Sequence, residues 1–153
     1  MIRTTVALTL GTAILVGALT AHPGLAMDGT VVKKDGADLA KARALIKDEK
    51  WDAALTELKR LENTIKTDSN VYNLLGFASR KNGAFETSYG FYQKALSLNP
   101  ENKSAREYLG ELHIQRGEMD KAREQAAILA KLCPEGCEER ADLDEALAEA
   151  EKK

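Results

Sequence analysis

The chain is poor in the residues from which reactive sites are usually built. Its 153 residues include two histidines, two cysteines, three prolines and one tryptophan. One histidine, His22, falls in a leader-like segment, which leaves His113 for the rest of the chain. No Ser–His–Asp arrangement, glycine-rich phosphate loop or paired His and carboxylate ligands can be assembled from what remains. We therefore expect a protein that is not an enzyme and that needs no cofactor.

Neither sign of charge dominates, since 22 Lys and Arg residues face 24 Asp and Glu residues and give a net charge of −2. The signs alternate along the chain, as in EERADLDEALAEAEKK. This pattern is typical of solvated helix faces and not of a surface that binds phosphates. We therefore expect no nucleic acid among the partners.

A long hydrophobic run is also missing. The longest, VALTLGTAILVGAL, has about 14 residues, which is short for a membrane span of about 20. Arg3 precedes it, and Gly24 and Ala26 provide small residues for cleavage, so residues 1–26 are interpreted as a signal peptide rather than an uncleaved anchor. We expect Gram-negative-type export to the periplasm or medium and no stable membrane anchor after cleavage.

From residue 36 onward, apolar residues recur every three or four positions, as on one face of a helix. Residues 27–34 have no such period and are predicted to form a flexible lead. The period predicts seven short amphipathic helices, whose apolar stripes span residues 39–46, 51–65, 71–78, 85–96, 108–112, 119–129 and 143–150.

Several residues recur at a spacing of 34 positions: Leu75 and Leu109, Gly76 and Gly110, Gly83 and Gly117, and Pro100 and Pro134. Together with Tyr72, Ser88, Tyr92 and Ala95, they make residues 69–102 resemble the tetratricopeptide repeat, a 34-residue helix pair. Residues 103–136 form a second copy, and residues 35–68 a degenerate first one in which Glu49 and Lys66 replace the turn glycine and the final proline. Residues 137–153 are predicted to be a capping helix. The resemblance implies an all-α fold, a right-handed α-solenoid of three helix pairs plus this cap.

In this family the first helix of each pair lines a concave groove that binds other proteins. The resemblance implies a non-catalytic scaffold or adaptor that binds a peptide or helix of an envelope protein, with self-association as an alternative. The groove is expected to be basic at its amino-terminal end and acidic at the other, with Phe77 as the aromatic contact. Its predicted residues are Arg43, Lys47, Asn70, Asn73, Phe77, Arg80, Lys81, Glu107 and Glu111. The places where one branch of the family clamps a terminal carboxylate hold Leu39, Leu74, Ser104 and Tyr108, so that activity is not expected. His113 takes a packing place and is interpreted as structural.

The two cysteines, Cys133 and Cys137, are four positions apart, one more than in a redox C-x-x-C motif. Export favours a disulfide between them, and free thiols or a bound metal are the alternatives. Two thiolates with Met119 or His113 would suit Cu(I). The alternative function is therefore a periplasmic copper- or redox-handling protein.

Overall fold

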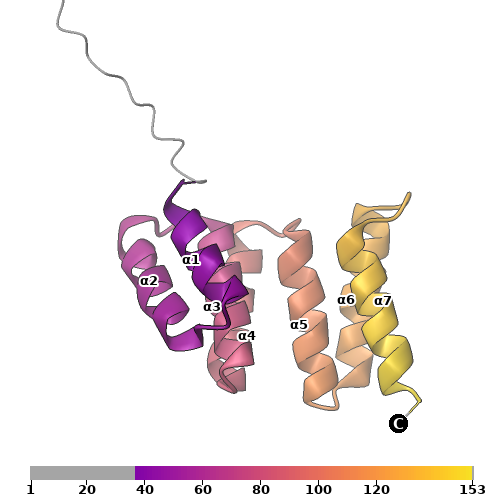
Figure 1. Cartoon of the computed structure of the whole chain (residues 1–153). Helices are drawn as coiled ribbons and strands as arrows, with labels where there is room; N and C mark the ends of the chain where they lie inside the picture. The colour runs from indigo at the N-terminus through magenta and orange to yellow at the C-terminus, as the bar shows by residue number, and fades with distance from the viewer. Residues whose placement is uncertain (1–36, 153) are drawn as a thin grey trace, which may run out of the picture. The chain divides into compact units, whose positions relative to one another are not determined.

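The 34-residue period of the sequence reappears in the positions of the helices. The computed structural model describes residues 37–152, all of them in the unit Val31–Lys153. They form seven α-helices and no strand: α1 (Ala37–Lys47), α2 (Trp51–Thr64), α3 (Ser69–Lys81), α4 (Phe85–Leu98), α5 (Lys103–Gln115), α6 (Met119–Leu132) and α7 (Glu138–Ala150) (Figure 1). The predicted all-α solenoid of helix pairs is confirmed. The predicted signal peptide (1–26) and flexible lead (27–34) lie outside the described residues.

Successive pairs have the same boundaries shifted by one period. Helices α2, α4 and α6 begin at Trp51, Phe85 and Met119, each 34 residues after the one before. The turn inside each pair contains a residue with positive φ, at Glu49 (56°), Gly83 (79°) and Gly117 (74°). The period therefore extends into the degenerate first pair, where a glutamate adopts the conformation that glycine adopts most readily.

Polar side chains fix the starts of α3 and α5. The Asp68 side chain accepts a hydrogen bond from the Asn70 backbone N–H at 2.7 Å, and the Asn102 side chain accepts one from the Ala105 backbone N–H at 3.0 Å. Each residue therefore caps its helix. The Asn102 side-chain amide also donates to Ser69 Oγ at 2.7 Å, and Ser69 donates to the Ala95 carbonyl at 2.9 Å. This buried chain of bonds joins the end of α4 to the starts of α3 and α5.

Glycine allows the close approach of helices at two equivalent places. A Cβ added to Gly76 would lie 2.5 Å from the Tyr92 ring, and one added to Gly110 would lie 2.6 Å from the Leu143 side chain. Ser88, fully buried, donates to the Gly76 carbonyl at 2.8 Å. Gly76 and Ser88 thus let α3 pack closely against α4.

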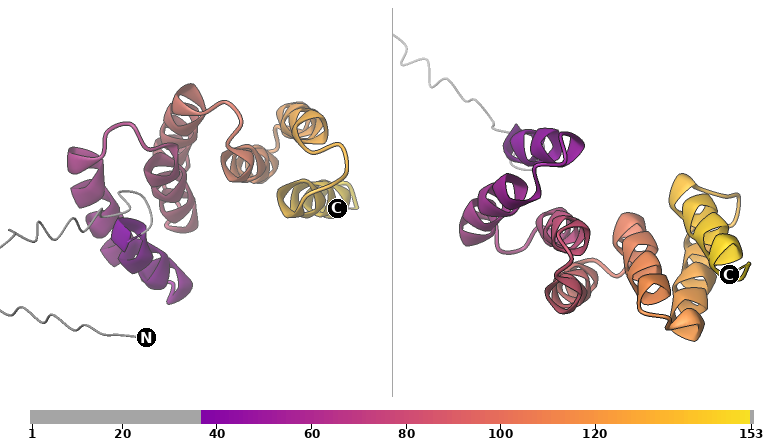
Figure 2. Two further views of the ribbon diagram at one scale, coloured as in Figure 1. Left: turned by 90° about the horizontal axis from the view of Figure 1, so that it is seen from above. Right: turned by 60° about the horizontal axis from the view of Figure 1, so that its bottom comes forward.

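The helices pack in chain order, so that α1 and α7 lie at opposite ends of the stack (Figure 2). One buried apolar cluster runs from Leu39 in α1 to Leu112 in α5, and a smaller one is formed by Ala122, Leu129, Leu143 and Leu147 in α6 and α7. Among residues 37–152, no helix is both long enough and apolar enough to cross a bilayer.

Candidate functional site

The first helices of the pairs and the last helix pack side by side, α1 on α3, α3 on α5 and α5 on α7. We call the surface of these four helices the first-helix face. The predicted groove residues all come from α1, α3 and α5, but the structure buries them to different degrees. Arg43, Lys47, Asn70 and Lys81 are exposed, Phe77 and Glu111 are half-buried, and Asn73, Arg80 and Glu107 are buried.

Arg80 was expected to offer its charge to a partner, and the structure places it inside the packing between α3 and α5. Only 4% of the residue is exposed, and its guanidinium is ion-paired with Glu111. The same group lies 5.6 Å from the centroid of the Phe77 ring and 5.8 Å from that of Tyr108. Arginine combines with aromatic faces and a carboxylate in this way when it is desolvated. Arg80 therefore holds the two helices together.

Lys81 supplies the exposed cation at this part of the face. Its Nζ lies 5.6 Å from the centroid of the Phe77 ring, which also contacts the rings of Trp51 and Tyr108 at centroid distances of 6.2 and 4.8 Å. Phe77 is thus half-buried between α2 and α5 and leaves only part of its ring for a partner. A ligand that reaches Phe77 also meets Lys81.

The carboxyl-terminal part of the face is acidic. Glu107 is 6% exposed, and burial, together with the nearby carboxylates of Glu111, Asp142 and Glu139, raises its pKa to about 8. Burial also raises the pKa of the Tyr108 phenol to about 12. The groove expected from the sequence did not include Glu139 and Asp142, because it was assigned from the repeats alone and these residues belong to the cap.

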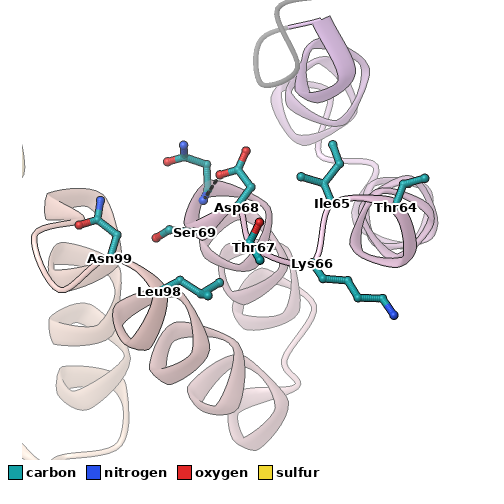
Figure 3. A pocket seen from close by; sticks show the side chains of 9 residues that line it. Thr64, Ile65, Lys66, Thr67, Asp68, Ser69, Leu98 and Asn99 are labelled. Carbon is teal, nitrogen blue, oxygen red and sulfur yellow. Dashed lines mark hydrogen bonds between the residues drawn. The ribbon is translucent and has the colours of Figure 1, made fainter.

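Two of the pockets on the described residues bear on the site. The smaller, of about 250 Å³, lies at the carboxyl ends of α3, α5 and α7 and joins the first-helix face; it is lined by Arg80, Lys81, Glu111, Ile114, Gln115, Ala146, Glu149 and Ala150. The larger, of about 410 Å³, lies between the α2–α3 connection and the end of α4 (Figure 3). There Asp68 Oδ1 accepts a hydrogen bond from the Asn70 backbone amide, Asp68 Oδ2 has no donor among the described residues, and the Lys66 side chain points away from Asp68. The smaller pocket is taken as part of the candidate site because three helices of the first-helix face line it.

The cysteine pair lies at the other end of the α5–α6 hairpin from the additional ligands that were considered. Met119 is the first residue of α6 and Cys133 follows its last, so about 20 Å of helix separates them. His113 is at the Met119 end, 3% exposed and bonded through Nδ1 to Glu118 Oε2 at 2.6 Å, as expected for a structural histidine. The hypothesis that Met119 or His113 completes a copper site is therefore wrong. The Cα atoms of Cys133 and Cys137 are 5.9 Å apart, which permits a disulfide. Their oxidation state stays a prediction.

Comparisons with known proteins agree on the fold. Residues 79–132 match a family model described as tetratricopeptide repeat. The TPR2B domain of yeast Sti1, solved in a complex with pHsp70, is similar with a TM-score of 0.70 and 16% identity over 78% of this chain and 97% of that one. The second TPR domain of human RPAP3, solved with the HSP70 peptide SGPTIEEVD, gives a TM-score of 0.66 at 16% identity and the same two coverages. PcrH, solved with the chaperone binding region of PopD, gives 0.64 at 20% identity over 75% of this chain and 86% of that one. A search of curated proteins finds no significant match.

Proposed function

Because residues 79–132 match a tetratricopeptide repeat model and the described helices have that fold, we propose that the chain is a non-catalytic interaction module that binds a segment of another protein on its first-helix face. The similar domains of yeast Sti1, human RPAP3 and PcrH were each solved in a complex, with pHsp70, an HSP70 peptide and the chaperone binding region of PopD respectively. This chain shares their fold, and the fold presents a row of first helices as an open surface.

The observation that carries the proposal is the unequal charge of the first-helix face. Arg43 and Lys47 on α1 and Lys81 on α3 are exposed cations, whereas the acidic residues gather on α5 and α7. Complementary charge at the two ends fixes the direction in which an extended peptide or a helix can bind. The partner is thus expected to be a polypeptide that carries charges of both signs.

We further propose that the partner is an envelope protein, because residues 1–26 resemble a signal peptide that would export the chain. A photo-crosslinking amino acid at position 81 tests the idea in the periplasm of the native cell. The matched control is position 59, because Lys59 is likewise an exposed lysine but belongs to α2, outside the first-helix face. Position 81 is expected to yield one discrete crosslinked species and position 59 none.

Charge reversal provides the second arm of this experiment. Lys81→Glu is expected to reduce the crosslink from position 43 at least fivefold, and Lys59→Glu to leave it unchanged. Arg80 is unsuitable for such a test, since a buried ion-paired arginine cannot be reversed without disturbing α3 and α5. Equal crosslinking from positions 81 and 59 would remove the basis for assigning binding to this face.

A further inference from the structure

We propose that the partner segment carries a lysine or arginine whose charged group binds Glu107, within an acidic patch formed by Glu107, Glu111, Glu139 and Asp142. This inference rests on the proposed function, because it specifies the chemistry of the ligand on the first-helix face. It goes beyond that proposal because it names the kind of side chain that binds at the acidic end of the face.

Glu107 is the centre of the patch because it is buried without a partner. The residue is 6% exposed, yet its carboxylate makes no hydrogen bond or ion pair with any residue between 37 and 152. A buried carboxylate without donors is costly, and side chains in this position normally find a partner. On α3, Asn73 is in the equivalent place, 34 residues earlier; it is 5% exposed, and its Oδ1 has no donor among the described residues. Asn73 Oδ1 is itself buried, whereas the Glu107 carboxylate oxygens keep surface that a ligand can reach, so Glu107 is the group that can bind one.

The charged groups around Glu107 leave it available for an external cation. On its own helix the nearby ionisable groups are Glu111 and Tyr108, and on α7 they are Glu139 and Asp142. The cation from α3, Arg80, is already bound to Glu111 and to two aromatic rings. The surroundings of Glu107 therefore remain acidic after every ion pair within the described residues has been formed.

A basic side chain meets these conditions better than other ligands. Lysine and arginine are donors without acceptors, so either supplies the donor that Glu107 lacks. An acidic segment such as the peptide SGPTIEEVD, bound by the RPAP3 domain, would be repelled by this patch. The four carboxylates are not arranged so that three of them could hold one metal ion, and no other such group occurs among residues 37–152, which favours a side-chain cation.

Binding of this kind is coupled to loss of a proton. Burial and the adjacent carboxylates raise the pKa of Glu107 to about 8, so its carboxyl is mainly protonated at neutral pH. A cation that binds the ionised form displaces this proton. Affinity should therefore increase with pH, by about tenfold from pH 6 to pH 7, and level off above pH 8.

The experiment selects, from a phage-displayed random peptide library, the clones that bind the full chain most strongly at pH 8. The consensus peptide is then synthesised. For each of its basic residues, a second version is made in which norleucine replaces that residue. Affinities are measured by fluorescence anisotropy for the original chain, for Glu107→Gln, for Lys81→Glu and for the control Glu124→Gln. Glu124 is exposed on α6, outside the first-helix face.

We expect the consensus to contain a conserved lysine or arginine, and norleucine in its place to weaken binding at least tenfold. In Glu107→Gln the affinities of the basic peptide and of its norleucine version should differ by less than twofold, and the dependence on pH should disappear. Glu124→Gln should behave as the original chain. Peptides that compete on the first-helix face but lack a basic residue, or whose basic residue is insensitive to Glu107→Gln, would overturn the inference and leave the proposed function standing. A library that yields no peptide sensitive to Lys81→Glu or Glu107→Gln would overturn both.

Discussion

Replacement of Gly110 by alanine tests how α7 is attached to the repeats. The new Cβ would lie 2.6 Å from both methyl carbons of Leu143, where about 3.5–4.0 Å is the ordinary contact distance. Leu143 is fully buried and cannot turn away, so α5 and α7 must separate by about 1 Å. Overpacking of this kind costs about 1–3 kcal/mol, and the better helix propensity of alanine returns about 1 kcal/mol. We expect Gly110→Ala to destabilise the protein by up to about 2 kcal/mol.

The chain offers a matched control in Gly90, an exposed glycine in α4 with no atom within 4 Å of its added Cβ. Gly90→Ala should stabilise the protein by about 0.5–1 kcal/mol through helix propensity alone. Leu143→Ala should cost about 2–5 kcal/mol by itself. Combined with Gly110→Ala it should cost less than the sum of the two single changes, because the truncated side chain no longer meets the new methyl group.

Urea unfolding followed by far-UV circular dichroism measures these free energies, and hydrogen exchange of the α7 amides shows where stability is lost. Protection should fall first in α7 in the Gly110→Ala protein, since repeat arrays transmit a local defect mainly to their neighbours. Two results would refute the close contact between Gly110 and Leu143. One is a Gly110→Ala protein as stable as Gly90→Ala, and the other is strict additivity in the double variant.

The other predictions concern the turns and the buried charges. Glu49→Gly should stabilise the protein by about 0.5–1 kcal/mol in urea unfolding, and Gly83→Ala should destabilise it by about 1 kcal/mol, because both positions have positive φ. Glu107→Gln should be nearly neutral at pH 5 and stabilising by about 2 kcal/mol at pH 9 in thermal unfolding. Its raised pKa means that the folded chain keeps a proton that the unfolded chain loses between about pH 4.5 and 8, so stability falls over that interval, and solvent screening reduces the full effect. Arg80→Met should cost about 3 kcal/mol in urea unfolding, because it leaves the Glu111 carboxylate without its partner. Adding Glu111→Leu should recover most of this loss, and a double variant no more stable than Arg80→Met would contradict the prediction.

The repeated part of the fold could be predicted from the sequence because it depends on residue type at fixed intervals. Gly76, Gly83 and Pro100 each have a steric role that their position alone reveals. Even the turn at Glu49 could be placed in register, since the surrounding period fixes its location. Such features are local or repeat-wide, and one sequence carries enough information for them.

The candidate site was less predictable, because exposure depends on which neighbours a long side chain meets. The place of Arg80 in its repeat indicated a groove residue, but the position of Tyr108 on α5 and the half-buried Glu111 draw its guanidinium into the helix packing. Glu139 and Asp142 were missed for another reason. The cap is not a repeat, and α7 begins at Glu138, 35 residues after α5 begins at Lys103, so the spacing that located the other groove residues does not apply to it.

The end of the stack explains why α7 belongs to the site and does not merely cover it. In the second repeat the space beside Gly76 is filled by Tyr92 of the same pair, and 34 residues later that aromatic is replaced by Ala126. The small side chain leaves the corresponding space beside Gly110 to Leu143, and Ala126 packs against the cluster that contains it. The third repeat thus completes its core only when α7 is bound. Since α7 also carries two carboxylates of the acidic patch, any change that detaches it should weaken stability and cation recognition together.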